Sequence, residues 1–190
     1  MPLVTALSCN RERRDDLCVI NDKRCPMHIS TFKDLYVAEL QELASAEDQL
    51  ADALLTMSEM ASHPALKRAL IGHRENTLAQ REQLIAILRK HGADPKAHTD
   101  QAMQALIKET EKMFTILQSQ DLRDAGLIGS AQKLEHYEIA AYGTAAALAG
   151  QLDLRDEQRT LHDSMEEEKE MDIQLTQLAK SEVNQDALAA

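Results

Sequence analysis

Glu135 and Glu138 place two carboxylates on one face of a predicted helix. Positions three apart are separated by only about 60° around the helix axis, at about 100° per residue. Glu138 also stands where the apolar stripe that includes Leu134 and Ala141 should continue. A buried carboxylate is costly unless it is paired or bound to a cation. This segment therefore predicts a compensating positive charge in the core.

The three other long predicted helices also interrupt their apolar stripes near the middle. The interruptions are Glu47 in the first helix, His73 with Thr77 in the second and Glu168 with Asp172 in the last. Carboxylate oxygen and imidazole nitrogen suit iron or manganese, and helical bundles hold two such ions with Glu and His from facing helices. The convergence predicts two iron ions, with manganese as the alternative metal. The candidate ligands are Glu47, His73, Glu135, Glu138, Glu168 and Asp172.

Two of these assignments have alternatives. A stripe that drifts around the first helix would carry Glu47 to solvent. Folding the first two helices back on each other places Glu47 level with Thr77, about 6 to 8 Å from the level of His73. Other candidates on the second helix are therefore Glu75, Asn76 and Gln80.

The elements that carry these residues are five predicted helices. They span residues 30–62, 64–90, 100–118, 121–150 and 153–180, the fourth beginning at Asp121 or Asp124. Short connections after the first and fourth helices predict antiparallel hairpins, and the third helix is long enough to cross between them. The expected fold is all-α, a four-helix bundle of two antiparallel hairpins linked by a crossover helix. It occupies residues 30–183, between an irregular extension (1–29) and a C-terminal tail (184–190).

Composition agrees with a helical protein and excludes several classes of partner. The 190 residues are 44% hydrophobic but only 3% aromatic, and the net charge of -11 argues against a nucleic-acid or anionic-membrane surface. No apolar run approaches the ~20 residues that span a bilayer, so we expect a soluble protein. The three cysteines all precede the first helix, which favours free thiols in a reducing, cytoplasmic compartment.

Four segments resemble one known family. "ASAEDQLADAL", "HRENT", "DAGLIGSAQKLEHYEIAAYGT" and "MEEEKEMDIQLTQLA" are similar to the YciE/YciF family of ferritin-like bacterial stress proteins, over about residues 31–183. The resemblance implies a ferritin-like bundle with a di-iron centre and a homodimer, and all six candidate ligands fall on matching positions. Asn76 and Ala44 depart from the family pattern, and either departure would weaken the site or move a ligand to Glu75. Family members begin shortly before the first helix, so Met27 is a candidate start.

Two functions follow as expectations. The first is a protein that binds Fe(II) in the bundle core and reacts with dioxygen or peroxide in stress defence, with ferroxidase or peroxide-reducing activity. The alternative is a non-catalytic dimeric stress protein that acts by protein contact and has a vestigial or salt-bridged polar core.

Overall fold

The computed structural model describes residues 29–189, which form helices and connecting loops without a strand. In chain order the helices are α1 (Phe32–Met60), α2 (Pro64–Lys90), α3 (Gln101–Ile116), α4 (Gln120–Gln151), α5 (Arg155–Leu178), the π-helical turn η1 (Ala179–Val183) and α6 (Asn184–Ala189). The all-helical prediction is confirmed. The predicted irregular extension lies, except for Ile29, outside the described residues, and α6 occupies most of the expected tail. None of the described helices has the length and apolar character to cross a membrane.

Local signals in the sequence set the helix ends. Thr31 caps α1: its hydroxyl accepts a hydrogen bond from the Asp34 amide at 3.1 Å, and the Asp34 carboxylate accepts one from the Thr31 amide at 2.9 Å. Pro64 occupies the first turn of α2, where a missing amide hydrogen costs nothing. Gly92 ends α2 with a φ of 68°, which a residue without Cβ adopts freely.

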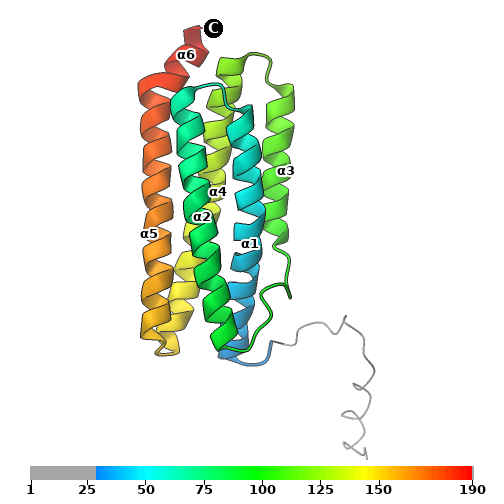
Figure 1. The fold of residues 1–190 in the computed structure, drawn as a ribbon, viewed down its shortest axis with the longest axis vertical. Coiled ribbons are helices and arrows are strands. Elements are labelled where there is room, and N and C mark those ends of the chain that lie inside the picture. Colours follow the sequence, from blue (N-terminus) through cyan, green and yellow to red (C-terminus); the bar gives the residue numbers. More distant parts are fainter. Residues whose placement is uncertain (1–28, 190) are drawn as a thin grey trace, which may run out of the picture.

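The long helices pack as two pairs. α1 lies against α2 and α4 lies against α5, and the connections at 61–63 and 152–154 leave room only for antiparallel neighbours. α1 also contacts α4, and α2 contacts α5, so these four helices surround a common core. α3 lies outside them against α1 and α4 (Figure 1).

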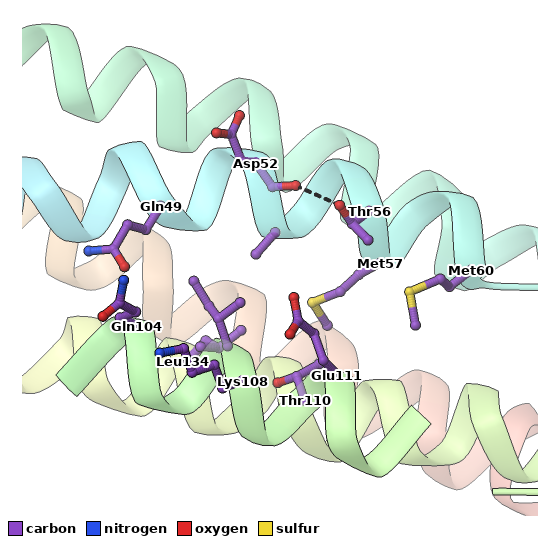
Figure 2. Close-up of a pocket in the computed structure, with 12 residues that line it drawn as sticks. Gln49, Asp52, Thr56, Met57, Met60, Gln104, Lys108, Thr110, Glu111 and Leu134 are labelled. Carbon is purple, nitrogen blue, oxygen red and sulfur yellow. Dashed lines mark hydrogen bonds between the residues drawn. The ribbon is translucent and has the colours of Figure 1, made fainter. Parts of the chain in front are cut away.

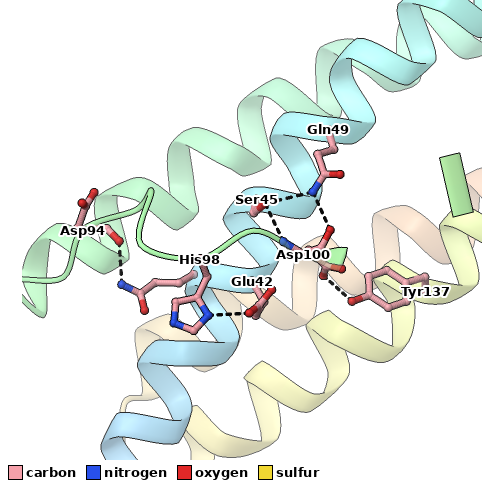
Figure 3. A network of polar contacts seen from close by, with 8 residues as sticks. Glu42, Ser45, Gln49, Asp94, His98, Asp100 and Tyr137 are labelled. Atoms are coloured by element: carbon pink, nitrogen blue, oxygen red, sulfur yellow. Dashed lines mark hydrogen bonds and ion pairs between the residues drawn. The ribbon is translucent and has the colours of Figure 1, made fainter. Parts of the chain in front are cut away.

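The connection between the two pairs is half loop and half helix. Residues 91–100 run along α1, where the side-chain amides of Gln41 and Gln49 donate hydrogen bonds to the backbone carbonyls of Asp94 and Asp100, at 2.7 and 2.9 Å. Asp100 then caps α3, and its carboxylate accepts a hydrogen bond from Tyr137 of α4 (Figure 3). The connection is thus attached to both helix pairs.

The core consists of two apolar clusters with a polar layer between them. Toward the α1–α2 turn one cluster includes Leu50, Leu54, Leu70, Leu127 and Leu134. Toward the opposite end the other includes Tyr36, Leu40, Leu43, Leu84, Tyr142 and Leu161. All four core helices pass from one cluster to the other, and the predicted interruptions of their apolar stripes other than Asp172 lie at the crossing.

Candidate metal centre

The polar layer contains five buried ionisable side chains contributed by four helices. They are Glu47 of α1, His73 of α2, Glu135 and Glu138 of α4 and Glu168 of α5. None is more than 3% exposed. The alternative in which the stripe of α1 drifts and carries Glu47 to solvent is therefore wrong.

Four of the five side chains converge on one point. One ligand atom from each of His73, Glu135, Glu138 and Glu168 lies within 4.8 Å of the other three, and we call this set the His–Glu cluster. The Nε2 atom of His73 lies 3.1 Å from Oε2 of Glu135 and 3.5 Å from Oε2 of Glu168. Among the described residues, His73 is the only basic side chain within ion-pair distance of these carboxylates.

The polar atoms of this layer lack hydrogen-bond partners. Both carboxylate oxygens of Glu135, Glu138 and Glu168, and Oε2 of Glu47, are buried without a partner among the described residues, as is Nε2 of His73. Buried polar groups in folded proteins are normally hydrogen-bonded, because an unsatisfied one costs about 1–3 kcal/mol and a charged one more. Seven such oxygens around one imidazole fit the oxygen-rich ligand set of iron or manganese.

Burial and mutual repulsion raise the pKa values of Glu47, Glu138 and Glu168 in the metal-free protein. Burial raises the pKa of Glu138 well above its usual value, and the charges of Glu47, Glu168 and Glu135 raise it further. Burial likewise raises the pKa of Glu168 to about 8, although the charge of His73 opposes the shift. Burial lowers the pKa of His73, but the charge of Glu135, whose Oε2 lies 3.1 Å from Nε2 of His73, and the charges of Glu168 and Glu47 outweigh it and raise this pKa to about 9. A bound cation would replace the protons.

Glu47 lies beside the His–Glu cluster and is held by a tyrosine. The Tyr142 hydroxyl donates a hydrogen bond to Oε1 of Glu47, and the other oxygen of Glu47 has no partner among the described residues. Tyr142 lies four residues after Glu138 on α4, so Glu138 is the nearest buried carboxylate along its own helix. The acceptor lies instead on α1, a choice that depends on which helix faces Tyr142 and that no spacing within one helix reveals.

On α2 the structure brings His73 to the cluster and leaves the other candidates outside it. Glu75 and Asn76 are exposed. Gln80 is buried, but its amide donates to Oε2 of Glu167 at 2.8 Å. The expected offset along the helix axis does not keep His73 from the cluster, because its Nε2 atom lies 3.1 Å from Oε2 of Glu135.

Asp172, the remaining predicted ligand, is placed outside the cluster. Its carboxylate accepts a hydrogen bond from the Gln132 side chain at 2.9 Å and lies 3.5 Å from Nε2 of His136. Gln132 also donates to Thr176, so a polar row at the edge of the α4–α5 interface holds Asp172 there. His136 is 68% exposed, as expected from its position on the outer face of α4.

Comparison with known proteins assigns the family. The profile of the domain of unknown function DUF892 matches residues 31–188. The chain belongs to the DUF892 family. Protein YciF of Escherichia coli (strain K12) is 38% identical to this chain over 162 residues, which is 85% of this chain and 98% of YciF. The predicted resemblance to the YciE/YciF family is confirmed.

Solved structures agree with the DUF892 assignment. The crystal structure of the E. coli stress protein YciF superposes with a TM-score of 0.78, at 38% identity, over 82% of this chain and 99% of YciF. YcfI of Rhodopseudomonas palustris, described as a candidate structural protein, gives a TM-score of 0.75 at 35% identity, over 78% of this chain and 94% of YcfI. A Xanthomonas campestris protein, XCC3681, is 18% identical with a TM-score of 0.63, over 80% of this chain and 92% of its own, and shares the fold.

Proposed function

We propose that this chain is a ferritin-like protein that binds two iron ions, or two manganese ions, in the polar layer of a four-helix bundle. In this interpretation α1–α2 and α4–α5 are the two antiparallel hairpins, and α3 with its preceding loop is the crossover. A bound pair of such ions would supply two-electron redox chemistry toward peroxide or dioxygen, and the glutamates of the polar layer with His73 would hold the ions. The proposal places this reaction in stress defence, in line with the description of YciF as a stress protein.

The observation that carries the proposal is the set of seven buried carboxylate oxygens without hydrogen-bond partners among residues 29–189. Four glutamates in an apolar core repel each other, and His73 neutralises only one charge. A protein selected for stability alone gains from replacing such a group with well-packed apolar residues. Divalent cations would neutralise the carboxylates and occupy their lone pairs.

The chain's own residues have distinct roles in this proposal. His73, Glu135, Glu138 and Glu168 would hold the ions, with Glu47 as a further ligand on the α1 side. Tyr142 fixes one oxygen of Glu47 and leaves the other free for an ion. The two apolar clusters lie above and below the layer.

Metal content tests the proposal directly. Protein purified without chelator is expected to contain about two metal ions per chain by mass spectrometry, and anaerobic Fe(II) followed by peroxide is expected to yield a ferric absorption band. The double variant Glu138→Gln/Glu168→Gln should bind little metal, because neutral amides are poor ligands. Glu157→Gln is the matched control: Glu157 is also buried on α5, but it bonds Tyr36 and His91 and lies outside the cluster. Equal metal content in both variants would refute the site.

A second candidate function has its own support. The ion pairs of His73 with Glu135 and Glu168 are those of a salt-bridged core, and YcfI is described as a candidate structural protein. In that case the chain acts by protein contact, as a homodimer, and a metal-free preparation is its working form.

A further inference from the structure

A polar cleft between α2 and α5 reaches the His–Glu cluster. Its volume is about 430 Å³, and His73 forms part of its wall. Gly72 also lines it, and a Cβ atom at this position would have no other atom within 4 Å, so the cleft is open there. The side chain of His73 thus belongs both to the wall of the cleft and to the His–Glu cluster.

A second groove, between α1 and α3, has a different character. Its volume is about 350 Å³, and the side chains that line it include Met57, Met60 and Leu134 (Figure 2). No member of the His–Glu cluster lines this groove. Leu134, which directly precedes Glu135 in the chain, lines this groove. Its apolar side chain has no atom that could bind a cation.

The lining of the α2–α5 cleft is acidic. Three carboxylates, Glu75, Glu167 and Glu170, face it against one guanidinium group, that of Arg68. Glu167 is fixed by the 2.8 Å hydrogen bond from Gln80, which is itself only 1% exposed. The negative charge is therefore partly held in place by a buried side chain.

Acidity alone does not define a route, but His73 supplies an independent observation. It is only 3% exposed, lines the cleft, and its Nε2 atom has no hydrogen-bond partner among residues 29–189. A cation in the cleft is therefore next to the side chain of His73, whose Nε2 atom contacts Glu135 and Glu168 of the cluster.

We infer that the α2–α5 cleft is the access route by which a hydrated divalent cation reaches the polar layer, with Glu75 and Glu170 attracting it at the mouth. The inference rests on the proposed function, because it gives the path to that metal centre. A concave surface lined by charge of one sign raises the local concentration of the opposite ion and its association rate. The α1–α3 groove leads to no ligand and serves no such purpose.

The test is a stopped-flow measurement of Co(II) binding to the full chain. Transfer of Co(II) from and to a chromophoric chelator gives the association and dissociation rates, and equilibrium competition gives Kd. Co(II) reports binding without peroxide chemistry, so the readout is independent of activity. Circular dichroism spectra verify that each variant is folded.

Two variants of the cleft separate charge from access. Glu75→Gln/Glu170→Gln should slow association about tenfold at low ionic strength, and this effect should shrink as salt screens the mouth. Gly72→Leu places a side chain in the open space of the cleft and should slow association and dissociation together, with Kd unchanged. The matched control Asp52→Asn/Glu111→Gln removes the same charge from the α1–α3 groove and should leave the rates as they are.

The outcomes are distinct. Slower binding in the cleft variants alone supports the route. Unchanged rates in the cleft variants, slower binding only in the control, or loss of equilibrium affinity in Glu75→Gln/Glu170→Gln would overturn it, the last because Glu75 would then be a ligand. If the wild-type chain binds no Co(II), Fe(II) or Mn(II) at equilibrium, the proposed function fails first and the route fails with it.

Discussion

At the scale of single residues, Glu168 and His73 make the stability of the metal-free protein depend on pH. The pKa of Glu168 rises from its ordinary value of 4.5 in the unfolded chain to about 8 in the folded one, so between these values the folded chain holds a proton that the unfolded chain releases. His73 contributes fully below its unfolded pKa of 6.5, and this contribution is lost as the pH rises through about 9. Both groups act in the same direction. We expect the free energy of unfolding of the metal-free protein to fall by a few kcal/mol between about pH 5 and pH 9.

Urea denaturation at several pH values in the presence of chelator measures this dependence. Glu168→Gln should flatten the fall, because one titrating group is removed, whereas Glu157→Gln should leave its slope unchanged. A metal-free protein whose stability rises with pH over this window would contradict the assignment of raised pKa values to the core. Bound metal should reverse the trend, since protons compete with it for the same atoms.

Tyr142 gives a second prediction at this scale. Tyr142→Phe removes the hydroxyl that donates to Glu47 and leaves a second oxygen of Glu47 buried without a partner. We expect the metal-free protein to lose about 1–3 kcal/mol of stability. Tyr137→Phe is a useful comparison, because its hydroxyl bonds Asp100 at a half-buried site outside the polar layer. An equal or larger loss in that variant would show that Glu47 does not depend on Tyr142.

The residues of the polar layer could be predicted to different degrees. Glu138 and Glu168 were visible because each replaces an apolar residue in a long regular stripe. Asp172 also falls on its stripe, yet Gln132 of the neighbouring helix holds it at the interface edge. One helix's periodicity gives the direction of a side chain only to within a sector, and the partner on the facing helix decides whether it enters the core. The Tyr142–Glu47 hydrogen bond joins two helices in the same way, so the periodicity of neither helix indicates it.

At the scale of helices, Asp124 of α4 fixes the turn between α1 and α2. Its carboxylate is buried and accepts hydrogen bonds from the backbone amides of Ser62 and His63, at 2.9 and 2.8 Å, and from the Ser62 hydroxyl. Asp124→Ala should destabilise the protein by about 2–3 kcal/mol, because two amides lose a charged acceptor. Asp121→Ala, in the first turn of the same helix, should cost about 0.3–1 kcal/mol through the helix dipole. Thermal unfolding compares the two, and equal losses would remove the special role of the turn.

Helix limits were predictable because their signals are local. Thr31, Pro64 and Gly92 each act within a turn of the helix end that they define. The loop before α3 was not predictable in the same way, since its course along α1 depends on Gln41 and Gln49, which are about 50 residues earlier. No local pattern indicates such pairings.

At the scale of the whole molecule, a homodimer stays a prediction carried by the family resemblance. The described surface exposes several large apolar side chains, among them Leu55, Ile71 and Ile173, and exposed apolar area is what self-association can bury. Sedimentation equilibrium should therefore give twice the 21.2 kDa chain mass. A single species of 21.2 kDa at micromolar concentration would exclude a stable dimer.

The His–Glu cluster draws its members from both helix pairs, with His73 on one and Glu135, Glu138 and Glu168 on the other. Neither pair alone holds the full set, so an ion bound there joins the two halves of the chain. At a free concentration of about 100 times Kd, binding stabilises the native state by about 2.7 kcal/mol, which makes the unfolded chain about one hundred times rarer. Proteases that cleave only opened chains would then degrade the protein more slowly when metal is plentiful. Its cellular lifetime would follow metal supply without any change in its synthesis.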